Sequence, residues 1–259
     1  MVKISTKVKE RIATSLKRYQ SILAKAQAKD INESDTVTIL IDILADLFGY
    51  DKFSEITSEY AIKRTFCDLA IKLDNIPRLL IEVKSAGLDL KAQHIKQAVD
   101  YGSNSGIDWV VLTNGVYWKI YKIIFSKPID TELVYEFSFL ELSAKKEKDI
   151  EQLYLLTREA MAKTSQTNSL EEFHSYKKIF NKYMISQILL SDDIIKGVKS
   201  ALKKVGATSK LDTEDLKDMI KNDIFKREVL DSAQATEASK KLTKALKGSQ
   251  KAKTEHQSE

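Results

Sequence analysis

Residues that support disulfides, zinc sites or membrane spans are scarce in this sequence. It contains one cysteine, Cys67, which excludes an intramolecular disulfide and is typical of a reducing compartment, so we expect a cytoplasmic protein. Its three histidines, His94, His174 and His256, lack zinc spacing, so any metal would be held by oxygen ligands. No apolar run approaches the roughly 18–20 residues of a membrane span, and the N-terminus predicts no secretory signal. The absence of a G-x-x-x-x-G-K-[ST] loop excludes a P-loop motor from these residues.

Charge, by contrast, is abundant and unevenly spread. The net charge is +5, yet residues 1–31 alone sum to +6, because eight basic side chains face only Glu10 and Asp30. A second basic run lies between Lys240 and Lys253. Basic clusters suit the phosphate backbone of nucleic acids, although lysines also solvate ordinary helix faces. The 43% hydrophobic content fits a globular protein of one or two domains.

Hydrophobic periodicity predicts an α-β-β-β-α-β-β order in the first half of the chain. The spacing predicts helices over 4–29 and 35–48, with Ser34 as the N-cap of the second and Gly49 at its end. Strands follow over Glu55–Lys63, Thr65–Leu73 and Arg78–Ser85, then a helix over Leu88–Tyr101 that stops at Gly102. Two short strands flank Asn114-Gly115, a pair typical of two-residue hairpin loops.

After about residue 145 the periodicity is helical throughout, which predicts a change of domain. The predicted organisation is a basic N-terminal helix (1–31), an α/β core (32–125), a linker (126–147), a helical C-terminal region (148–230) and a basic tail (231–259) that is either disordered or a frayed helix.

Three charged residues interrupt the hairpin predicted over 66–87. If this hairpin turns through Asp74-Asn75-Ile76 and is symmetric about Asn75, Asp68 lies directly opposite Glu82, with Lys84 two residues along on the same face. Opposed carboxylates repel each other in a sheet, whereas a divalent cation would bind both. The alternative is a solvent-facing strand on which Glu and Lys are neighbours. The opposite face is expected to carry Cys67, as a buried apolar residue, with Leu69, Ile81 and Val83.

The spacing of Asp68 and Glu82-Val83-Lys84 resembles the PD-(D/E)XK nuclease core. A closer resemblance is to the N-terminal nuclease domain of type I restriction enzyme R subunits, and it extends from about Glu33 to Tyr121. It is carried by these further stretches: "NESDT" at Asn32–Thr36, "FGY" at Phe48–Tyr50, "SEY" at Ser58–Tyr60, "QAVDY" at Gln97–Tyr101, and "TNG" followed by "YWKIY" at Thr113–Tyr121.

The resemblance implies a restriction-endonuclease-like mixed sheet flanked by helices, here with an all-helical C-terminal region. It implies that Asp68 and Glu82 bind Mg²⁺, or Mn²⁺, with Glu33 as a further ligand, and that Lys84 supports the attacking water. The residues that match the family's Q-x-x-x-Y motif, Gln97 and Tyr101, would assist at the site or on DNA. The implied partner is DNA, with other restriction or defence subunits and a homodimer left open, and no membrane.

Three functions remain open from the sequence. The first is a Mg²⁺-dependent DNA endonuclease without a helicase motor, in restriction, defence or DNA processing. The second is a non-catalytic nucleic-acid-binding or adaptor protein that retains the nuclease fold. The third is an interaction protein whose functional part is the helical region 148–230.

Overall fold

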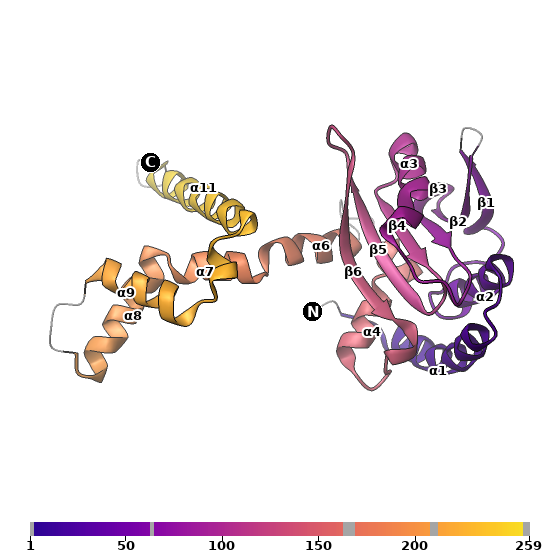
Figure 1. Ribbon diagram of the computed structural model, residues 1–259, viewed down its shortest axis with the longest axis horizontal. Coiled ribbons are helices and arrows are strands. Elements are labelled where there is room, and N and C mark those ends of the chain that lie inside the picture. The colour runs from indigo at the N-terminus through magenta and orange to yellow at the C-terminus, as the bar shows by residue number, and fades with distance from the viewer. Residues whose placement is uncertain (1–2, 63–64, 163–168, 208–211, 256–259) are drawn as a thin grey trace. The chain divides into compact units, whose positions relative to one another are not determined.

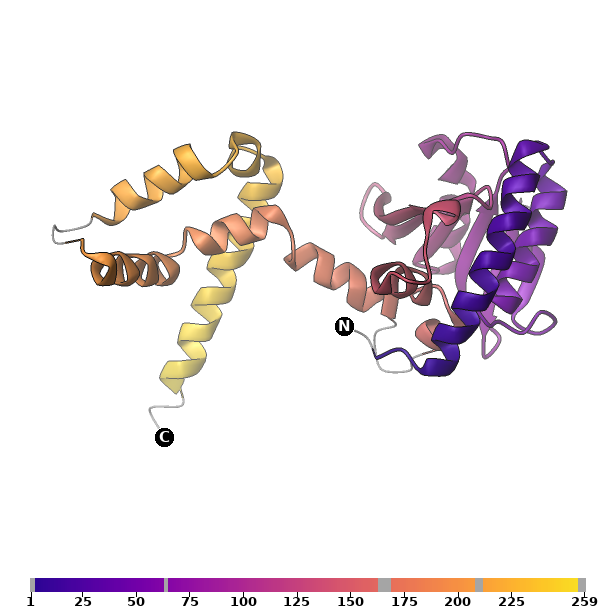
Figure 2. The same cartoon turned by 90° about the horizontal axis from the view of Figure 1, so that it is seen from below.

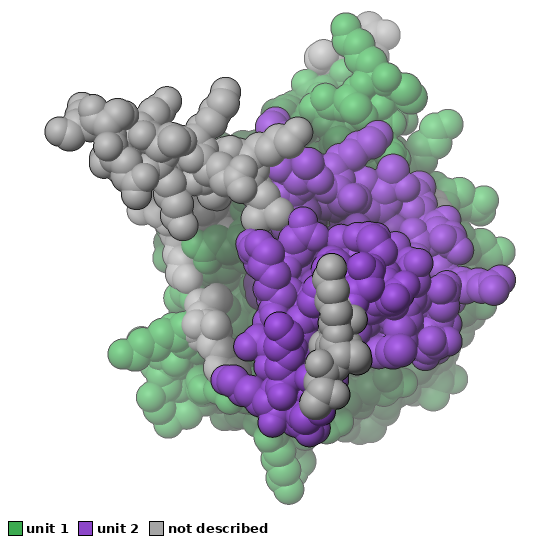
Figure 3. Space-filling view, turned by 90° about the vertical axis from the view of Figure 1, so that its left-hand side faces the viewer, with its two compact units in different colours: residues 1–172 green, residues 173–259 purple. Residues whose placement is uncertain are grey.

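Two compact units make up the chain, residues 1–172 and residues 173–259, which are coloured separately in Figure 3. The structure is a computed structural model that describes residues 3–62, 65–162, 169–207 and 212–255. The first unit is α/β and the second is helical. No helix within the described residues is long and apolar enough to cross a membrane.

A six-stranded mixed sheet forms the centre of the first unit (Figure 1). Its strands lie in chain order, and β3 and β4 are parallel while all other neighbours are antiparallel. The predicted fold class, a mixed α/β core flanked by helices and followed by a helical region, is therefore confirmed. The strands are β1 (Ile56–Ile62), β2 (Thr65–Leu73), β3 (Ile76–Val83), β4 (Trp109–Thr113), β5 (Tyr117–Ile124) and β6 (Asp130–Ser138).

Helices α1 (Thr6–Ala28) and α2 (Glu33–Asp46) lie side by side (Figure 2, indigo) on one side of the sheet, where Phe48 packs against Trp118 of β5. The apolar residues at helical spacing, which predict the first helix, are buried: Val8, Ile12, Leu16, Tyr19, Leu23 and Ala26. The predicted N-cap of α2, Ser34, is wrong. Asn32 caps it instead, because the Asn32 side chain accepts a hydrogen bond from the backbone N–H of Asp35.

The opposite face is covered by a 3₁₀ turn, η1 (Ala92–Ile95), and by α3 (Lys96–Ser105). The prediction that this helix starts at Leu88 and stops at Gly102 is wrong. Gly102 lies inside α3, and the helix ends at Gly106, whose φ of 68° is left-handed. A Cβ on Gly102 would lie 2.4 Å from Ile123 Cδ1 and 2.8 Å from the carbonyl oxygen of Ile107. Glycine is therefore present because α3 packs closely, and not because the helix ends there.

We expect Gly102→Ala to lower the free energy of unfolding of the first unit by about 1–3 kcal/mol, because the new methyl group overlaps a backbone carbonyl. Both tryptophans, Trp109 and Trp118, are in this unit, so their fluorescence during urea unfolding measures it. The matched control is Gly197→Ala in the second unit, where an added Cβ meets no atom within 4 Å. Helix propensity should make that change stabilising by about 0.5–1 kcal/mol, as followed by circular dichroism.

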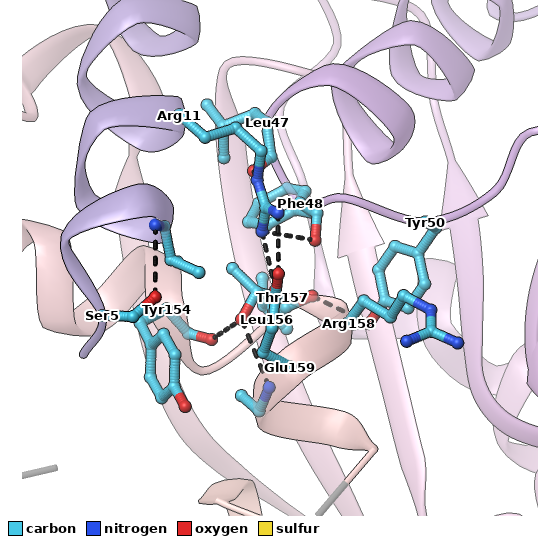
Figure 4. Close-up of polar contacts among 12 residues, drawn as sticks. Ser5, Arg11, Leu47, Phe48, Tyr50, Tyr154, Leu156, Thr157, Arg158 and Glu159 are labelled. Atoms are coloured by element: carbon cyan, nitrogen blue, oxygen red, sulfur yellow. Dashed lines mark hydrogen bonds and ion pairs between the residues drawn. The ribbon is translucent and has the colours of Figure 1, made fainter. Parts of the chain in front are cut away.

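The residues after β6 belong to the first unit, which differs from the predicted linker and boundary. β6 itself occupies part of the range predicted as linker. Beyond it, the turn η2 (Phe139–Glu141) leads to α4 (Glu147–Tyr154) and α5 (Arg158–Met161), and α4 contacts α1. Arg11 donates to both carboxylate oxygens of Glu159 at 2.7 Å and to the carbonyl oxygens of Leu47 and Phe48 (Figure 4).

Long-range polar contacts of this kind attach the segment around α5 to the rest of the first unit. Tyr50 donates its hydroxyl hydrogen to the carbonyl of Leu156 at 2.9 Å, and Arg158 pairs with Glu55 at 2.7 Å. These partners are about a hundred residues apart, so local periodicity carries no signal of them.

The second unit consists of short helices and one longer helix, α11 (Ala233–Glu255), in the range predicted as a disordered tail or a frayed helix. The sequence lacks a wide apolar face there, but small residues suffice for contact: Ala235 and Ala238 are buried, and α11 contacts α7. The other helical segments are α6 (Ser169–Ile179), which begins in the first unit, α7 (Lys182–Leu189), α8 (Asp192–Val205), α9 (Thr213–Met219), the π-helical turn η3 (Ile220–Ile224) and α10 (Arg227–Leu230).

Candidate active site

The hairpin of β2 and β3 has the expected register but reaches it differently. The chain turns through two residues, Asp74 and Asn75, which have φ values of 52° and 63°, so the predicted three-residue turn is wrong. The pairing nevertheless shifts by one residue between Ile71 and Lys72. This bulge restores the alignment expected from symmetry about Asn75, and the paired ladder ends with Leu69 opposite Ile81.

Asp68 and Glu82 are the next positions on each strand, and they lie on the face covered by α3. They are two residues from Ala70 and Leu80, which belong to the buried cluster beneath α3. At this point a side chain replaces the backbone hydrogen bonds between β2 and β3, because Asp68 Oδ2 accepts a hydrogen bond from the N–H of Val83 at 2.7 Å.

The backbone around Asp68 is irregular on its other side as well. Glu59 in β1 lies between the pairs Ser58–Leu69 and Tyr60–Cys67, and its φ of 49° is unusual for a strand residue. Local strain of this kind concentrates at functional sites, and here it accompanies the carboxylate predicted to act.

Lys84 connects two carboxylates from different elements. Its Nζ lies 2.7 Å from Glu82 Oε1 and 3.3 Å from Glu33 Oε2. The side chain of Glu82 is only 6% exposed and that of Lys84 only 17%, so solvent screens their ion pair weakly. The remaining oxygen of Glu82, Oε2, is buried and accepts no hydrogen bond from any described residue.

Burial sets the protonation of this group of residues. It raises the pKa of Glu82 to about 7, against the opposing hydrogen bond from Lys84, and the charge of Asp68 raises it further. Burial also raises the pKa of Asp68, while the N–H of Val83 acts in the opposite direction. Desolvation alone would lower the pKa of Lys84, but its bond to Glu82 raises it overall. A carboxyl that titrates near neutral pH is typical of functional sites.

The turn between α1 and α2 brings Glu33 to the site. Asp30 has a left-handed φ of 46°, and the carbonyl of Ile31 accepts the N–H of Ala86 at 3.2 Å. A Cβ on Gly87 would lie 2.2 Å from Asp30 Oδ1, so a larger residue here would require the Asp30 side chain to move. The segment that follows Lys84 is thereby attached to the N-terminus of α2, whose first residue is Glu33.

Gln97 and Tyr101 meet each other, as their four-residue spacing predicts. Gln97 Nε2 donates to Tyr101 Oη at 2.9 Å. The ring of Tyr101 is buried in the cluster that contains Ala70 and Leu80. The pair therefore lies over the sheet face that carries Asp68 and Glu82. The roles predicted for these residues, and for the metal ligands, stay predictions.

Two sequence expectations near the site are wrong. Cys67 does not separate from the Asp68 face, because it joins the buried cluster with Ala98 and Tyr101, and its Sγ lies 3.3 Å from the carbonyl oxygen of Ile81. Burial raises the pKa of its thiol to about 12, which makes it unreactive. The second error is the two-residue loop at Asn114-Gly115, since Thr113 pairs with Trp118.

Asn114 is a positioning residue that sequence reasoning missed. Its side chain is buried, accepts hydrogen bonds from the N–H groups of Val116 and Tyr117, and donates to the carbonyl of Leu88 at 2.9 Å. It thus holds the segment between Lys84 and α3 against the loop after β4. The "TNG" motif, which both predicts a turn and contributes to the family resemblance, does not by itself indicate this contact with Leu88.

This arrangement offers carboxylate oxygens that could bind one cation or one proton. The described side chains do not, however, already form a metal site with three ligands in place. Among the described side chains, no three or more His, Cys, Asp or Glu residues form a group that could hold a metal ion as they stand. The reason lies in the geometry, since the ammonium group of Lys84 lies between Glu82 and Glu33. Mg²⁺ commonly takes one or two protein carboxylates and fills its other positions with water and substrate phosphate.

The basic side chains of α1 are partly used within the first unit. Lys9, Arg11 and Arg18 form ion pairs with Glu147, Glu159 and Asp46. The others that lie on this helix and its C-cap, Lys7, Lys17, Lys25 and Lys29, are exposed.

Comparison with known proteins finds a family match within the first unit. Residues 33–134 match the family model described as "Type I restriction enzyme R protein N terminus", so the resemblance predicted from the motifs is confirmed. This region is therefore similar to a restriction-type, nuclease-like domain, and it contains all six predicted site residues. No curated protein and no solved structure matches the chain significantly.

Proposed function

We propose that the protein is a Mg²⁺-dependent DNA endonuclease that acts in restriction, defence or DNA processing. The observation that carries the proposal is the cluster of Asp68, Glu82, Lys84 and Glu33 at the C-terminal end of β3. All four residues lie within the region that matches a restriction-enzyme family. A buried carboxylate, Glu82, and a half-buried one, Asp68, beside a lysine are a donor set suited to phosphodiester hydrolysis with a divalent metal.

The residues present fit a divalent cation. Glu82 Oε2 is a buried carboxylate oxygen without a hydrogen bond from the described residues, which is costly unless a proton or a cation satisfies it. Glu82 and Asp68 would hold Mg²⁺ or Mn²⁺, and Glu33 would join them. The metal, when bound, supplies a Lewis acid and an acidified water.

The other residues of the candidate site each have a distinct role in the proposal. Lys84 changes partners from the carboxylates to the attacking water or to a phosphate oxygen, where its charge opposes the developing negative charge. Asp68 keeps the end of β3 in place through the N–H of Val83. Gln97 and Tyr101, which are bonded to each other, position the strand beside the cleaved bond.

The charge of the two units indicates where the DNA backbone is held. The first unit carries 24 basic and 25 acidic side chains, so its net charge is −1, whereas residues 173–259 carry 18 and 12 and sum to +6. Non-specific affinity for DNA comes from basic groups that displace counterions. In the proposal the second unit supplies most of that affinity, and the first unit supplies the chemistry.

The test is cleavage by the purified protein of supercoiled, linear and single-stranded DNA with Mg²⁺ or Mn²⁺. We expect cleavage that EDTA abolishes and that Asp68→Ala reduces by at least about 10²-fold, since loss of a metal ligand removes the cation. Metal-dependent cleavage that persists at the wild-type rate in Asp68→Ala would contradict the proposal. DNA binding without cleavage under any metal would instead favour the non-catalytic adaptor.

A change in the salt dependence of binding is expected from the lysines of α11. Lys240, Lys241 and Lys244 are exposed. Replacing all three by glutamine should lower the slope of log K against log salt by up to about 2.7, at roughly 0.9 for each lost phosphate contact. Fluorescence anisotropy with a labelled duplex in EDTA at several salt concentrations measures this slope.

The matched control removes the same charge from the first unit. Lys52, Lys72 and Lys127 lie at or beyond the sheet end away from the candidate site, and their triple glutamine variant should keep the wild-type slope. Equal slopes for the two triple variants would show that α11 does not hold the DNA.

A further inference from the structure

A cavity of about 460 Å³ lies on the same sheet face as the candidate site, and the proposed chemistry does not use it. It opens where β5 and β6 meet the segment before η1. Its lining residues are Tyr117, Lys119, Glu136, Ser138, Asp89 and Leu90, with Trp118, Phe137 and Glu141 completing the wall.

The strand register places this cavity beside the cleavage chemistry. Glu82 pairs with Leu112, Leu112 with Lys119, and Lys119 with Glu136, so these residues form one row across the sheet on one face. Lys119 is two strands from Glu82, which corresponds to about 10 Å. A nucleotide next to the cleaved bond can span that distance.

The lining of the cavity is unsuitable for phosphate and suitable for a base. Three carboxylates, those of Asp89, Glu136 and Glu141, contribute acceptors and negative charge, which repels a phosphate group. The positive charge of Lys119 is already engaged, because its Nζ donates to the carbonyl of Leu90 at 3.2 Å and lies 3.8 Å from Glu136 Oε2.

An aromatic platform completes this chemistry. Tyr117 is 44% exposed and lines the cavity, and Leu90 offers an apolar wall nearby. Aromatic side chains bind unpaired bases by stacking, and carboxylates accept hydrogen bonds from exocyclic amino groups such as N4 of cytosine.

We propose that this cavity binds an unpaired nucleobase with an exocyclic amino group, from the strand that passes through the cleavage site. Tyr117 stacks on the base, and Glu136 accepts its amino hydrogen. The inference rests on the proposed function, since it assigns the substrate of that function a single-stranded nucleotide beside the cleaved bond. Cytosine and adenine fit the lining, whereas thymine presents an acceptor in place of the amino group.

The test measures binding without metal, so that it does not depend on cleavage. Labelled 12-mers of dC, of dT and of abasic nucleotides are titrated with the full-length protein in EDTA. Because each strand repeats a single nucleotide, the result does not depend on which position of the strand occupies the cavity. Wild type should bind dC at least about fivefold more tightly than dT, and the abasic strand most weakly.

Variants of the cavity then separate stacking from amino-group recognition. Tyr117→Ala should weaken binding of dC by about 5- to 150-fold, to the level of the abasic strand, and leave binding of the abasic strand unchanged. Tyr117→Phe should keep wild-type affinity, and Glu136→Gln should reduce the preference for dC over dT. Phe53→Ala is the control, because Phe53 is 92% exposed and lies before β1, away from the cavity.

Two results would overturn the inference. One is equal binding of dC, dT and abasic strands by wild type, and the other is a Tyr117→Ala variant that weakens all three strands alike. Base-dependent binding without cleavage under any metal would leave the cavity assigned and reject the nuclease. Cleavage without any base preference would reject the cavity and leave the nuclease.

Discussion

Replacing Lys84 with methionine should lower the rate of DNA cleavage by about 10²- to 10⁴-fold while metal binding is retained. The rate falls because the ammonium group that would orient the water or oppose the developing charge is lost, and such groups contribute on this scale. Metal binding persists, or tightens, because Nζ currently lies 2.7 Å from Glu82 and 3.3 Å from Glu33 and competes with any cation there.

Single-turnover cleavage and Mn²⁺ titration by calorimetry measure the two effects of this change separately. Methionine keeps most of the side-chain volume, and the melting temperature checks that the variant folds. Lys72→Met is the matched control, because Lys72 lies near the other end of the same hairpin, with its Nζ 4.7 Å from the ring centroid of Tyr60. A Lys84→Met enzyme that cleaves as fast as wild type would remove Lys84 from the mechanism.

The elements with strong periodicity were predictable from the sequence. The stripe of α1 appears residue by residue in the core, and the strands β1 to β5 lie within a few residues of their expected ranges. The ends of the helices were less predictable, because side-chain contacts determine where a helix begins and ends. Asn32 instead of Ser34 caps α2, and Gly102 is inside α3 because the helix packs against Ile107 and Ile123.

The position of the candidate site was predictable for a different reason. A strand has a period of two, so only the register of the hairpin had to be correct for Asp68 and Glu82 to share a face. The predicted turn is one residue longer than the observed turn, and the bulge after Ile71 compensates for this difference. No local sequence pattern indicated the bulge. The sequence therefore predicted that Asp68 and Glu82 share a face, but it did not predict the turn and the bulge that align them.

Features that depend on distant contacts were outside the reach of sequence reasoning. Asn114 binds the carbonyl of Leu88, and Arg11 binds Glu159, 148 residues away. The ion pair between Lys84 and Glu33 joins residues 51 positions apart, so the resemblance suggested Glu33 but periodicity could not. For the same reason the boundary of the first unit falls at residue 172 and not in the predicted linker.

The stability of the metal-free protein should fall as the pH rises through about 7, and Glu82 should be the cause. Its pKa in the folded protein is about 7, raised mainly by burial, against 4.5 for an ordinary glutamate. A raised folded-state pKa means that the protonated carboxyl favours folding and the ionised form opposes it. The full contribution is therefore present below about pH 4.5 and is lost above about pH 7, a loss of roughly 3 kcal/mol.

Divalent metal should reverse this loss, because only the ionised carboxyl binds a cation. Melting temperatures in EDTA should fall by about 6–12 °C more in wild type than in Glu82→Gln between pH 5 and pH 8. Added Mn²⁺ should raise the melting temperature of wild type at pH 8 far more than at pH 6, and should not affect Glu82→Gln. Glu136→Gln, which removes an exposed carboxylate three strands away, should behave as wild type. If Glu82→Gln showed the wild-type pH dependence and the wild-type response to Mn²⁺, the buried carboxyl would be neither the titrating group nor the metal ligand. The nuclease proposal would then lose its central residue.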